Sequence, residues 1–220
     1  MRREEYEVSV DDEVRSSLQI PMRAILLRGA DIGSRPEVSE GFVSKVREEV
    51  RRRHTLESIK SDRIFRAYRD FYWRIGIDPT KVRPSSEALV RRMLQNKPIP
   101  RINPFVDVCN LVSALTSITF SVLDFRKLWG SLRLTWSKEG EPFLGIGFTK
   151  TETLTGRKLV MRDNYGVVSI YPYRDSERTK VDRSTRDVLI VLCGVTGIRP
   201  DDLLEAEIKL LEAIETELFR

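Results

Sequence analysis

Histidine, cysteine and long apolar runs are scarce in this sequence, and each scarcity removes a class of function. His54 is the only histidine among 220 residues, and Cys109 and Cys193 are the only cysteines. A Ser-His-Asp hydrolase requires a histidine beside its nucleophile, and a zinc site requires several closely spaced ligands, so neither is supported. Both cysteines lie in apolar runs, which favours buried free thiols in a reducing compartment. We expect no metal and no cofactor.

Targeting and nucleotide-binding signals are also absent from the sequence. No stretch reaches the roughly 18 uninterrupted apolar residues of a membrane span. The start, MRREEYEVSVDDEVR, lacks the apolar core of a secretory signal. The segment GIGFTKTETLTG has neither the GxGxxG spacing nor the GK[ST] of a P-loop. These observations predict a cytoplasmic protein with no membrane partner.

Positive charge is in moderate excess. The chain has 38 Lys and Arg against 33 Asp and Glu, a formal net charge of +5, with 40% hydrophobic residues. The apolar content is typical of a globular protein rather than a disordered one. The basic excess favours a nucleic-acid partner without requiring one.

The first half of the sequence has the apolar spacing of helices, predicted at 38–54, 61–75, 85–95 and 104–116, and a final helix at 200–218 follows Pro200. Ser61, Ser85 and Asn103 are suited to the N-cap positions of three of these helices. In the second half, short apolar runs such as SLRLTWS, PFLGIGF, KLVMRD and VVSIYPY alternate with turns, as in an antiparallel sheet or sandwich. The run DVLIVLCGV predicts a central strand covered on both faces. Early runs at 5–30 could pair with each other or join the later sheet.

Polar residues within apolar runs are candidate site residues. Asp107 and Asn110 lie in the run of the fourth helix, and Asp124 follows the strand-like segment TFSVL. Burying such groups without partners costs about 1–3 kcal/mol, so each must join a hydrogen-bond network or face a pocket. The sequence leaves both roles open, and acid/base work by Asp107 and Asp124 would require a short distance between them.

The segment GIDPTKVRPSSEALVRRML, residues 76–94, combines a proline-bounded loop with cations that a helix alone does not require. Two interpretations remain open. The cations contact RNA phosphates, or they pair with Glu87, Asp70 and Asp78 to hold the helix junction. The candidate phosphate contacts are Arg66, Arg69, Lys81, Arg91, Arg92 and Arg101.

Three motifs carry a resemblance to a known family. The segments IDPTKVRPSSEALVRR, RINPFVDVCN followed by LVS, and RDSERT resemble the B3/B4 domain of the phenylalanyl-tRNA synthetase β subunit, in a stand-alone form. The resemblance implies an α+β fold with helices packed on a mostly antiparallel layered β-sandwich. It also implies a single B3/B4-like domain over 1–220, with the family module at about 60–195, an N-terminal extension at 1–58 and a C-terminal helix at 200–218.

The synthetase domain that these motifs resemble is an editing centre, which hydrolyses tyrosine wrongly attached to phenylalanine tRNA. The family motif VDVTN aligns with Val106 to Asn110, with Cys109 in place of threonine. Ser121 stands at the position of the editing histidine, and Val191 stands near that of the glutamate that recognises tyrosine. Editing of the bacterial type is therefore not expected.

Three functions remain possible: a tRNA or aminoacyl-tRNA binding module, a trans-acting deacylase of mischarged aminoacyl-tRNA, and an amino-acid-like small-molecule binder without RNA. We expect a polar pocket to bring together residues from four segments. The candidates are Arg83, Ser85, Ser86, Glu87, Arg101, Asn103, Asp107, Asn110, Ser121, Asp124, Asp175, Ser176 and Thr179.

Overall fold

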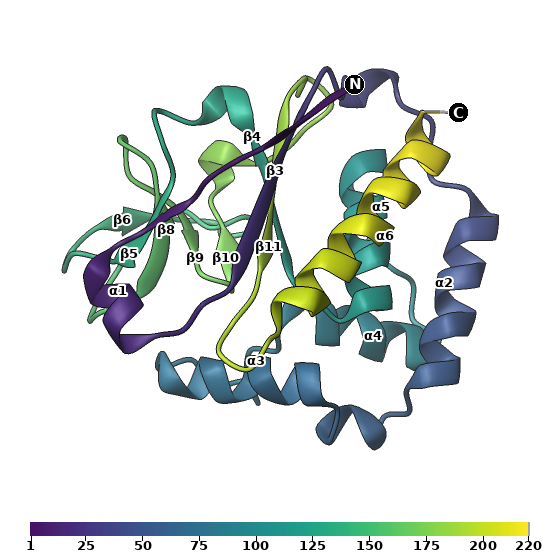
Figure 1. Cartoon of the computed structure of the whole chain (residues 1–220), viewed down its shortest axis with the longest axis horizontal. Helices are drawn as coiled ribbons and strands as arrows, with labels where there is room; N and C mark the ends of the chain where they lie inside the picture. The colour runs from purple at the N-terminus through teal and green to yellow at the C-terminus, as the bar shows by residue number, and fades with distance from the viewer. Residues whose placement is uncertain (220) are drawn as a thin grey trace.

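The computed structural model describes residues 1–219 and arranges them in layers of two sheets and a group of helices (Figure 1). The first sheet contains β1 (Arg2–Glu5), β3 (Met22–Arg28), β11 (Val188–Cys193) and β4 (Phe120–Asp124), in the order β1-β3-β11-β4. The second contains β10 (Arg174–Asp175), β9 (Val167–Ile170), β8 (Leu159–Arg162), β5 (Arg133–Trp136) and β2 (Ser9–Val10), in that order. A separate hairpin pairs β6 (Pro142–Phe143) with β7 (Glu152–Thr153).

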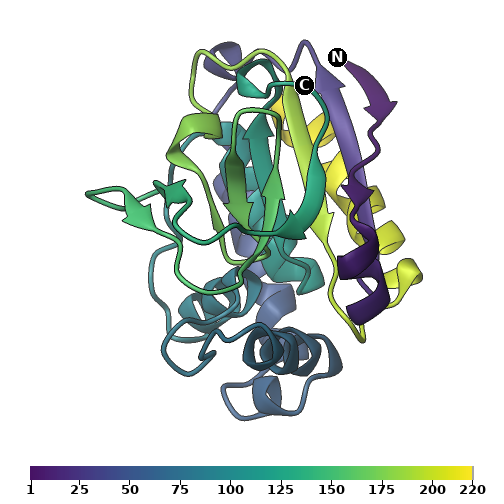
Figure 2. The same ribbon diagram turned by 90° about the vertical axis from the view of Figure 1, so that its left-hand side faces the viewer.

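The helices are α1 (Asp12–Ser17), α2 (Glu40–Arg53), α3 (Arg63–Arg74), α4 (Ser85–Leu94), α5 (Pro104–Thr116) and α6 (Pro200–Leu218). Short 3₁₀ turns lie at Ile32–Ser34, Ser58–Lys60, Phe125–Lys127 and Glu177–Thr179. Helices α5 and α6 pack on the first sheet, and the second sheet lies on its other side (Figure 1). Figure 2 shows the second sheet in front of the first, with α3 below both. This α+β arrangement of mostly antiparallel sheets confirms the predicted fold class.

Strand β11 is the centre of the first sheet. Ile190 is paired with Ile25 of β3 on one side and with Val122 of β4 on the other, and all six residues of β11 are buried. An uninterrupted apolar run is stable here because both faces of the strand are covered. The prediction of a central strand is confirmed, and the pairing of β3 shows that an early run joins the later sheet.

The segment PFLGIGF was predicted as a strand, but only Pro142–Phe143 forms one. Gly147 adopts a positive φ of 84°, which is incompatible with an extended strand. The chain leaves β6 after Phe143, makes one isolated bridge from Gly145 to Ser176 and then turns at Gly147.

Two of the three predicted N-caps differ by one residue in the structure. Asp62, not Ser61, caps α3, because its carboxylate accepts hydrogen bonds from the amides of Ile64 and Phe65 at 2.9 and 3.1 Å. Pro84 occupies the N-cap position of α4 and Ser85 is its first helical residue. Asn103 caps α5 as predicted, accepting the amide of Val106 at 3.0 Å.

Most buried apolar side chains form one cluster that spans the helices and both larger sheets, and a smaller cluster lies beneath the β6–β7 hairpin. The aromatic face of α3 belongs to the larger cluster, with Phe65, Tyr68, Phe71 and Tyr72 each at most 2% exposed. Cys109 and Cys193 are buried free thiols, as predicted. Over residues 1–219, no helix has the length and apolar character needed to cross a membrane.

Candidate functional site

A cationic cleft of about 750 Å³ lies between α4 and the segment that leads into β10. Its lining includes six cations, Lys81, Arg83, Arg91, Arg92, Lys97 and Arg174, together with polar and apolar groups from Ser85, Gln95, Ile102, Asn110 and Tyr173. Within the described chain, no Asp or Glu side chain lines this cleft. Its walls therefore favour an anionic ligand.

Arg91 and Arg92 are each anchored through a single nitrogen. The Nε of Arg91 donates to Glu87 at 2.7 Å, and the Nε of Arg92 donates to the carbonyl of Pro98 at 2.9 Å. The terminal Nη atoms of both side chains have no hydrogen-bond acceptor among residues 1–219. Two adjacent guanidinium groups are thus held in place with their outer donors available to a ligand.

Glu87 is the carboxylate that organises this part of α4. Its side chain is fully buried and accepts the Nε of Arg69 at 2.7 Å as well as that of Arg91. Burial opposes ionisation, but the hydrogen bonds from the two arginines outweigh it and lower the pKa of Glu87. The three groups together carry one net positive charge beside the cleft.

Arg83 and Lys97 supply cations that have no ion pair. Among residues 1–219, neither side chain makes a hydrogen bond or salt bridge, and both are exposed. Lys81 is 4.0 Å from Asp78, at the limit of an ion pair. Exposed cations of this kind retain their hydration and mobility until a ligand arrives.

Arg174 enters the cleft from the sheet side. Its guanidinium contacts the rings of Tyr173 and Phe148, at 5.1 and 5.4 Å from their centroids, and one Nη donates to the carbonyl of Ile146 at 3.1 Å. Its Nε is buried without an acceptor in the described part of the chain. The aromatic contacts fix the orientation of this cation.

Ser121 and Asp175 form a second polar group where β4 approaches β10. The hydroxyl of Ser121 donates to Asp175 at 2.7 Å, and the amide of Val122 donates to the other carboxylate oxygen at 3.2 Å. Burial raises the pKa of Asp175 despite these bonds. Ser121 is therefore bonded to a half-buried carboxyl group.

Asp107 is buried at the start of α5, where one carboxylate oxygen accepts the amide of Ile102 at 2.8 Å and the other makes no hydrogen bond among the described residues. Burial raises its pKa, and Arg101, 3.8 Å away, opposes that rise. Arg101 also donates to Glu40 at 2.7 Å. The two residues secure the entry to α5 and do not line the cleft.

Asp124 lies at the other end of β4 from Phe120. It accepts the hydroxyl of Thr185 at 2.7 Å and the amide of Arg126 at 3.0 Å. Ser176 caps the 3₁₀ turn that follows it by accepting the amide of Arg178, and Thr179 is fully buried. These contacts hold backbone turns in place.

The structure divides the residues that the sequence suggested. Those in the cleft are Arg83, Ser85, Asn110, Lys81, Arg91 and Arg92. Those that support its walls are Ser86, Glu87, Asn103 and Arg69. The remaining ones, Arg101, Asp107, Ser121, Asp124, Asp175, Ser176 and Thr179, do not line it, and Arg66 lines a different pocket of about 450 Å³ with Arg63 and Arg74.

Sequence reasoning missed Lys97, Tyr173 and Arg174 as cleft residues. Arg174 is the first residue of the motif RDSERT and directly precedes the candidate residue Asp175, so the motif already indicated this segment as part of a site. Lys97 follows α4 in a turn where Asn96 has a positive φ of 58°. This turn reverses the chain direction and places Lys97 in the lining of the cleft. No pattern in the sequence specified the reversal.

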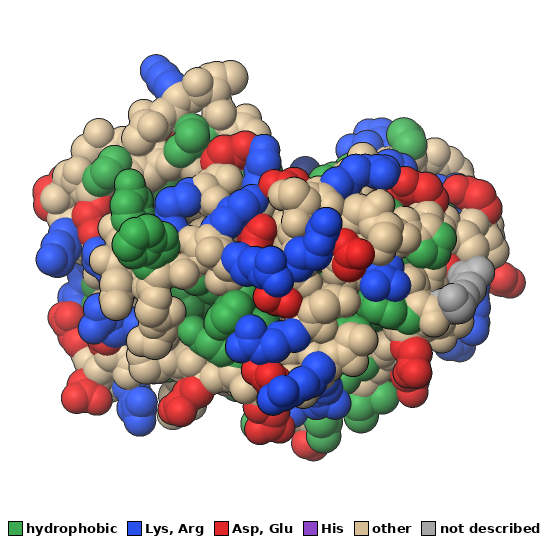
Figure 3. Space-filling model, turned by 90° about the horizontal axis from the view of Figure 1, so that it is seen from above, with side chains coloured by type: hydrophobic (Ala, Val, Ile, Leu, Met, Phe, Trp, Pro, Cys, Tyr) green, Lys and Arg blue, Asp and Glu red, His purple; other side chains and the backbone are tan. Residues whose placement is uncertain are grey.

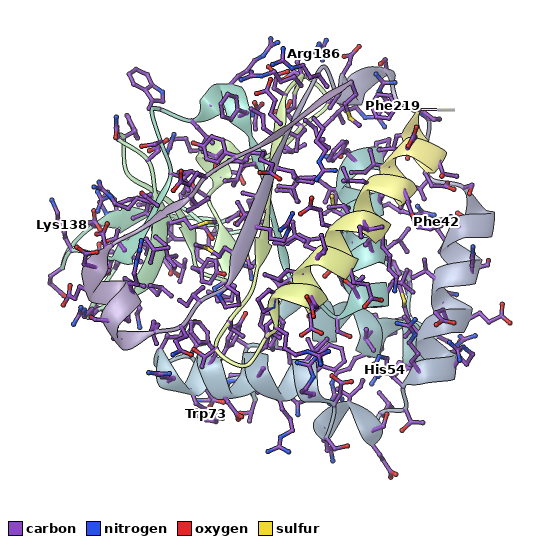
Figure 4. All side chains as sticks on the ribbon, viewed as in Figure 1. Phe42, His54, Trp73, Lys138, Arg186 and Phe219 are labelled. Atoms are coloured by element: carbon purple, nitrogen blue, oxygen red, sulfur yellow. The ribbon has the colours of Figure 1, made fainter. Side chains whose placement is uncertain are left out.

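Elsewhere, opposite charges are mixed. The face in Figure 3 carries Lys and Arg side chains interspersed with Asp and Glu. Arg186, labelled at the top of the molecule in Figure 4, pairs with Asp31 at 2.9 Å, and Arg126 pairs with Asp187 at 2.9 Å. The cleft differs because most of its cations lack an acidic partner.

Comparison with known proteins assigns the family. The profile described as the B3/4 domain matches residues 67–201, more than half of the chain. The chain belongs to the B3/4 domain family. The matched range includes α4, α5 and every cleft residue, so the site described above lies within the family module.

The curated relatives of this B3/4 protein are phenylalanine–tRNA ligase β subunits. The chain is 36% identical over 89 residues to that of Bartonella henselae, covering 40% of this chain and 11% of the relative. It is 35% identical over 115 residues to that of Nocardia farcinica, covering 52% and 13%. The matches thus span only a small part of those relatives' length.

Among solved structures, an N-terminal fragment of the phenylalanyl-tRNA synthetase β subunit from Pyrococcus horikoshii is similar. The comparison gives a TM-score of 0.47 and 15% sequence identity, and it covers 97% of this chain and 52% of the other.

Proposed function

We propose that the cationic cleft binds the phosphate backbone of tRNA or aminoacyl-tRNA, and that the protein acts as a tRNA-associated binding module in the cytoplasm. The observation that carries the proposal is the pair Arg91 and Arg92, anchored through Nε and with free Nη donors in a cleft without acids. The relationship to phenylalanine–tRNA ligase β subunits supports tRNA as the class of RNA. The proposed unit is the whole chain, with residues 60–195 as the binding module.

Anchoring makes these arginines suitable for phosphate. A guanidinium presents paired donors that match two phosphate oxygens. A side chain already held by Glu87 or Pro98 loses less conformational freedom on binding than a free one, so more of the interaction energy appears as affinity. Arg83 and Lys97, which are mobile, then add charge without fixing direction.

The test is titration of the full chain with deacylated tRNA at several salt concentrations. Each phosphate neutralised releases counterions, so Arg91→Ala and Arg92→Ala should each reduce the slope of log K against log salt by about one, or somewhat less on single strands. Arg92→Lys should keep the slope and weaken affinity, because it keeps the charge and loses the paired donors. Arg52→Ala is the matched control, since Arg52 is 70% exposed on α2 and paired with Glu49.

An unchanged slope for Arg91→Ala and Arg92→Ala, with wild-type melting temperatures, would contradict RNA binding in the cleft. A lower melting temperature without any change in RNA affinity would assign the arginines to the helix junction instead. Binding of free amino acids with no response to tRNA would favour the small-molecule alternative.

A trans-acting deacylase is the second candidate, supported by the half-buried Asp175 and its bond to Ser121 next to Tyr173 and Arg174. Burial raises the pKa of Asp175, which makes it a stronger base toward water than an ordinary aspartate. Deacylation of a panel of mischarged tRNAs, with Asp175→Asn as the variant, tests it. Rates equal to those without protein would exclude deacylation of the tRNAs tested.

A further inference from the structure

Trp129 and Tyr165 form an exposed aromatic pair far outside the cleft residues. Their side chains are 65% and 70% exposed, the two highest values among aromatic residues of the described chain. Their ring centroids lie 6.2 Å apart at an interplanar angle of 48°. Two large rings that meet at the surface, from segments 36 positions apart, are not explained by core packing.

One buried carboxylate fixes the backbone that carries both rings. Asp163 is 2% exposed and accepts the amides of Trp129 and Tyr165, each at 2.9 Å. Arg178 donates to both oxygens of Asp163 at 2.9 and 3.0 Å, and its guanidinium lies 4.9 Å from the Tyr165 ring. The rings are therefore presented on a fixed backbone rather than on mobile loops.

A second contact fixes the two loops against each other. The amide of Asn164 donates to the carbonyl of Trp129 at 2.9 Å. Gly130 has a positive φ of 76°, and a Cβ there would come within 2.4 Å of the Asn164 side chain. The left-handed backbone at this position favours glycine, and any larger residue would also displace the Asn164 side chain.

The surroundings of the pair are polar and cationic. Gly130, Ser131 and Asn164 are exposed, so the rings are not the centre of an apolar patch of the kind that protein partners bury. An adjoining depression of about 420 Å³ is lined by Asp11, Arg133, Thr135, Trp136, Lys138, Arg162, Asp163 and Asn164. Arg162 is 17% exposed and pairs with Glu141 at 2.9 Å, whereas Arg133 is 50% exposed and only 3.7 Å from Asp11. Lys138 has no ion pair among residues 1–219, and Asp163 is neutralised by Arg178.

We infer that Trp129 and Tyr165 stack on unpaired nucleobases of a single-stranded RNA segment whose phosphates pass along Arg133 and Lys138. Any base offers an aromatic face to such rings, whereas recognition of a protein would require apolar neighbours. The inference takes its class of ligand from the proposed function but depends on different residues, so each can fail alone.

The experiment uses an eight-nucleotide single-stranded RNA that contains 2-aminopurine, titrated into the full chain. Binding should quench 2-aminopurine fluorescence, because stacking on an aromatic ring does so. Trp129→Ala and Tyr165→Ala should each weaken binding by roughly 5- to 150-fold and remove quenching, whereas Trp129→Phe should retain most of both. The weakening should be the same at low and high salt, since the stacking surface is uncharged.

Trp73→Ala is the control. Trp73 is 57% exposed on α3, at the lower edge of the molecule in Figure 4, away from the strands that carry the aromatic pair. Its substitution should leave binding and quenching unchanged. Equal losses for Trp73→Ala, or unchanged affinity and no quenching effect for Trp129→Ala and Tyr165→Ala, would overturn the inference, even if a protein partner then proved to bind the pair.

The cleft variants separate this result from the proposed function. If Arg92→Ala lowers the salt slope for tRNA while Trp129→Ala changes no RNA affinity, the cleft proposal stands and the stacking site falls. If Trp129→Ala weakens the oligonucleotide while Arg91→Ala and Arg92→Ala change nothing, the stacking site stands and the cleft proposal falls.

Discussion

The buried carboxylate of Glu87 accepts the Nε of Arg91, one helical turn further along α4, at 2.7 Å. The same carboxylate accepts two nitrogens of Arg69 from α3. One group therefore joins two helices and sets the orientation of a cleft cation. The junction between α3 and α4 and the binding surface depend on the same ion-pair network.

Glu87→Gln should be strongly destabilising. It leaves two arginines, each about one-fifth exposed, without their counter-charge, and the loss of free energy of unfolding should be about 2–4 kcal/mol. Urea denaturation followed by circular dichroism measures it. Glu49→Gln, at a solvent-screened pair on α2, should cost much less. Equal losses in the two variants would show that the Glu87 network adds no special stability.

Tyr68→Phe should lower stability by about 1–3 kcal/mol, because it removes a buried hydroxyl that serves two backbone groups. That hydroxyl donates to the carbonyl of Cys193 at 2.6 Å and accepts the amide of Thr119 at 3.0 Å, linking α3 to the ends of β11 and β4. Tyr72→Phe is the matched control, since the Tyr72 hydroxyl makes no hydrogen bond within residues 1–219. Thermal melts of both variants under one buffer condition decide the point, and equal shifts would contradict it.

His54 should titrate below its ordinary value of 6.5, because burial against the Phe65 ring disfavours the charged imidazole and lowers its pKa. A lowered pKa in the folded state means that the unfolded chain binds the proton more tightly. The contribution of His54 to stability is therefore complete above about pH 6.5 and is lost as pH falls through the folded pKa.

The single histidine makes the measurement simple. Its ring proton resonance in a proton NMR titration reports the folded pKa without assignment ambiguity, and His54→Gln should flatten the stability profile between neutral and mildly acidic pH. A midpoint at or above 6.5 would show that the attraction of Asp62 exceeds the effect of burial.

Gly194→Ala should destabilise the protein by about 2–4 kcal/mol, because the added methyl would meet the carbonyl oxygen of Pro21 at 2.2 Å and the backbone must move. Gly41→Ala on α2 is the control. Its added methyl meets only the Ser39 hydroxyl, at 4.0 Å, and alanine favours a helix by roughly 0.5–1 kcal/mol over glycine. Melting temperatures that move in opposite directions are expected, and a neutral Gly194→Ala would refute the close contact.

Local pattern was sufficient for most of the elements. Helix α5 follows from Asn103 and Pro104 at its start, and β11 follows from an apolar run too short for a helix. The predicted N-cap of α3 was wrong by one residue. The carboxylate of Asp62, next to Ser61, accepts two backbone amides and is a stronger acceptor than a serine hydroxyl. A helix boundary is uncertain by one residue when two adjacent side chains can each cap the first turn.

The sequence by itself determined the α+β class, the buried thiols, the aromatic core face of α3 and the presence of unusual cations around α4. Only the tertiary structure decided what each cation does. Arg69 and Arg91 turn toward Glu87, Arg83 has no ion pair within residues 1–219, and Arg66 lies in another pocket. The physical reason is that periodicity specifies which side of a helix is buried, whereas an ion pair depends on the distance between groups on different elements, which the packing of the whole chain sets.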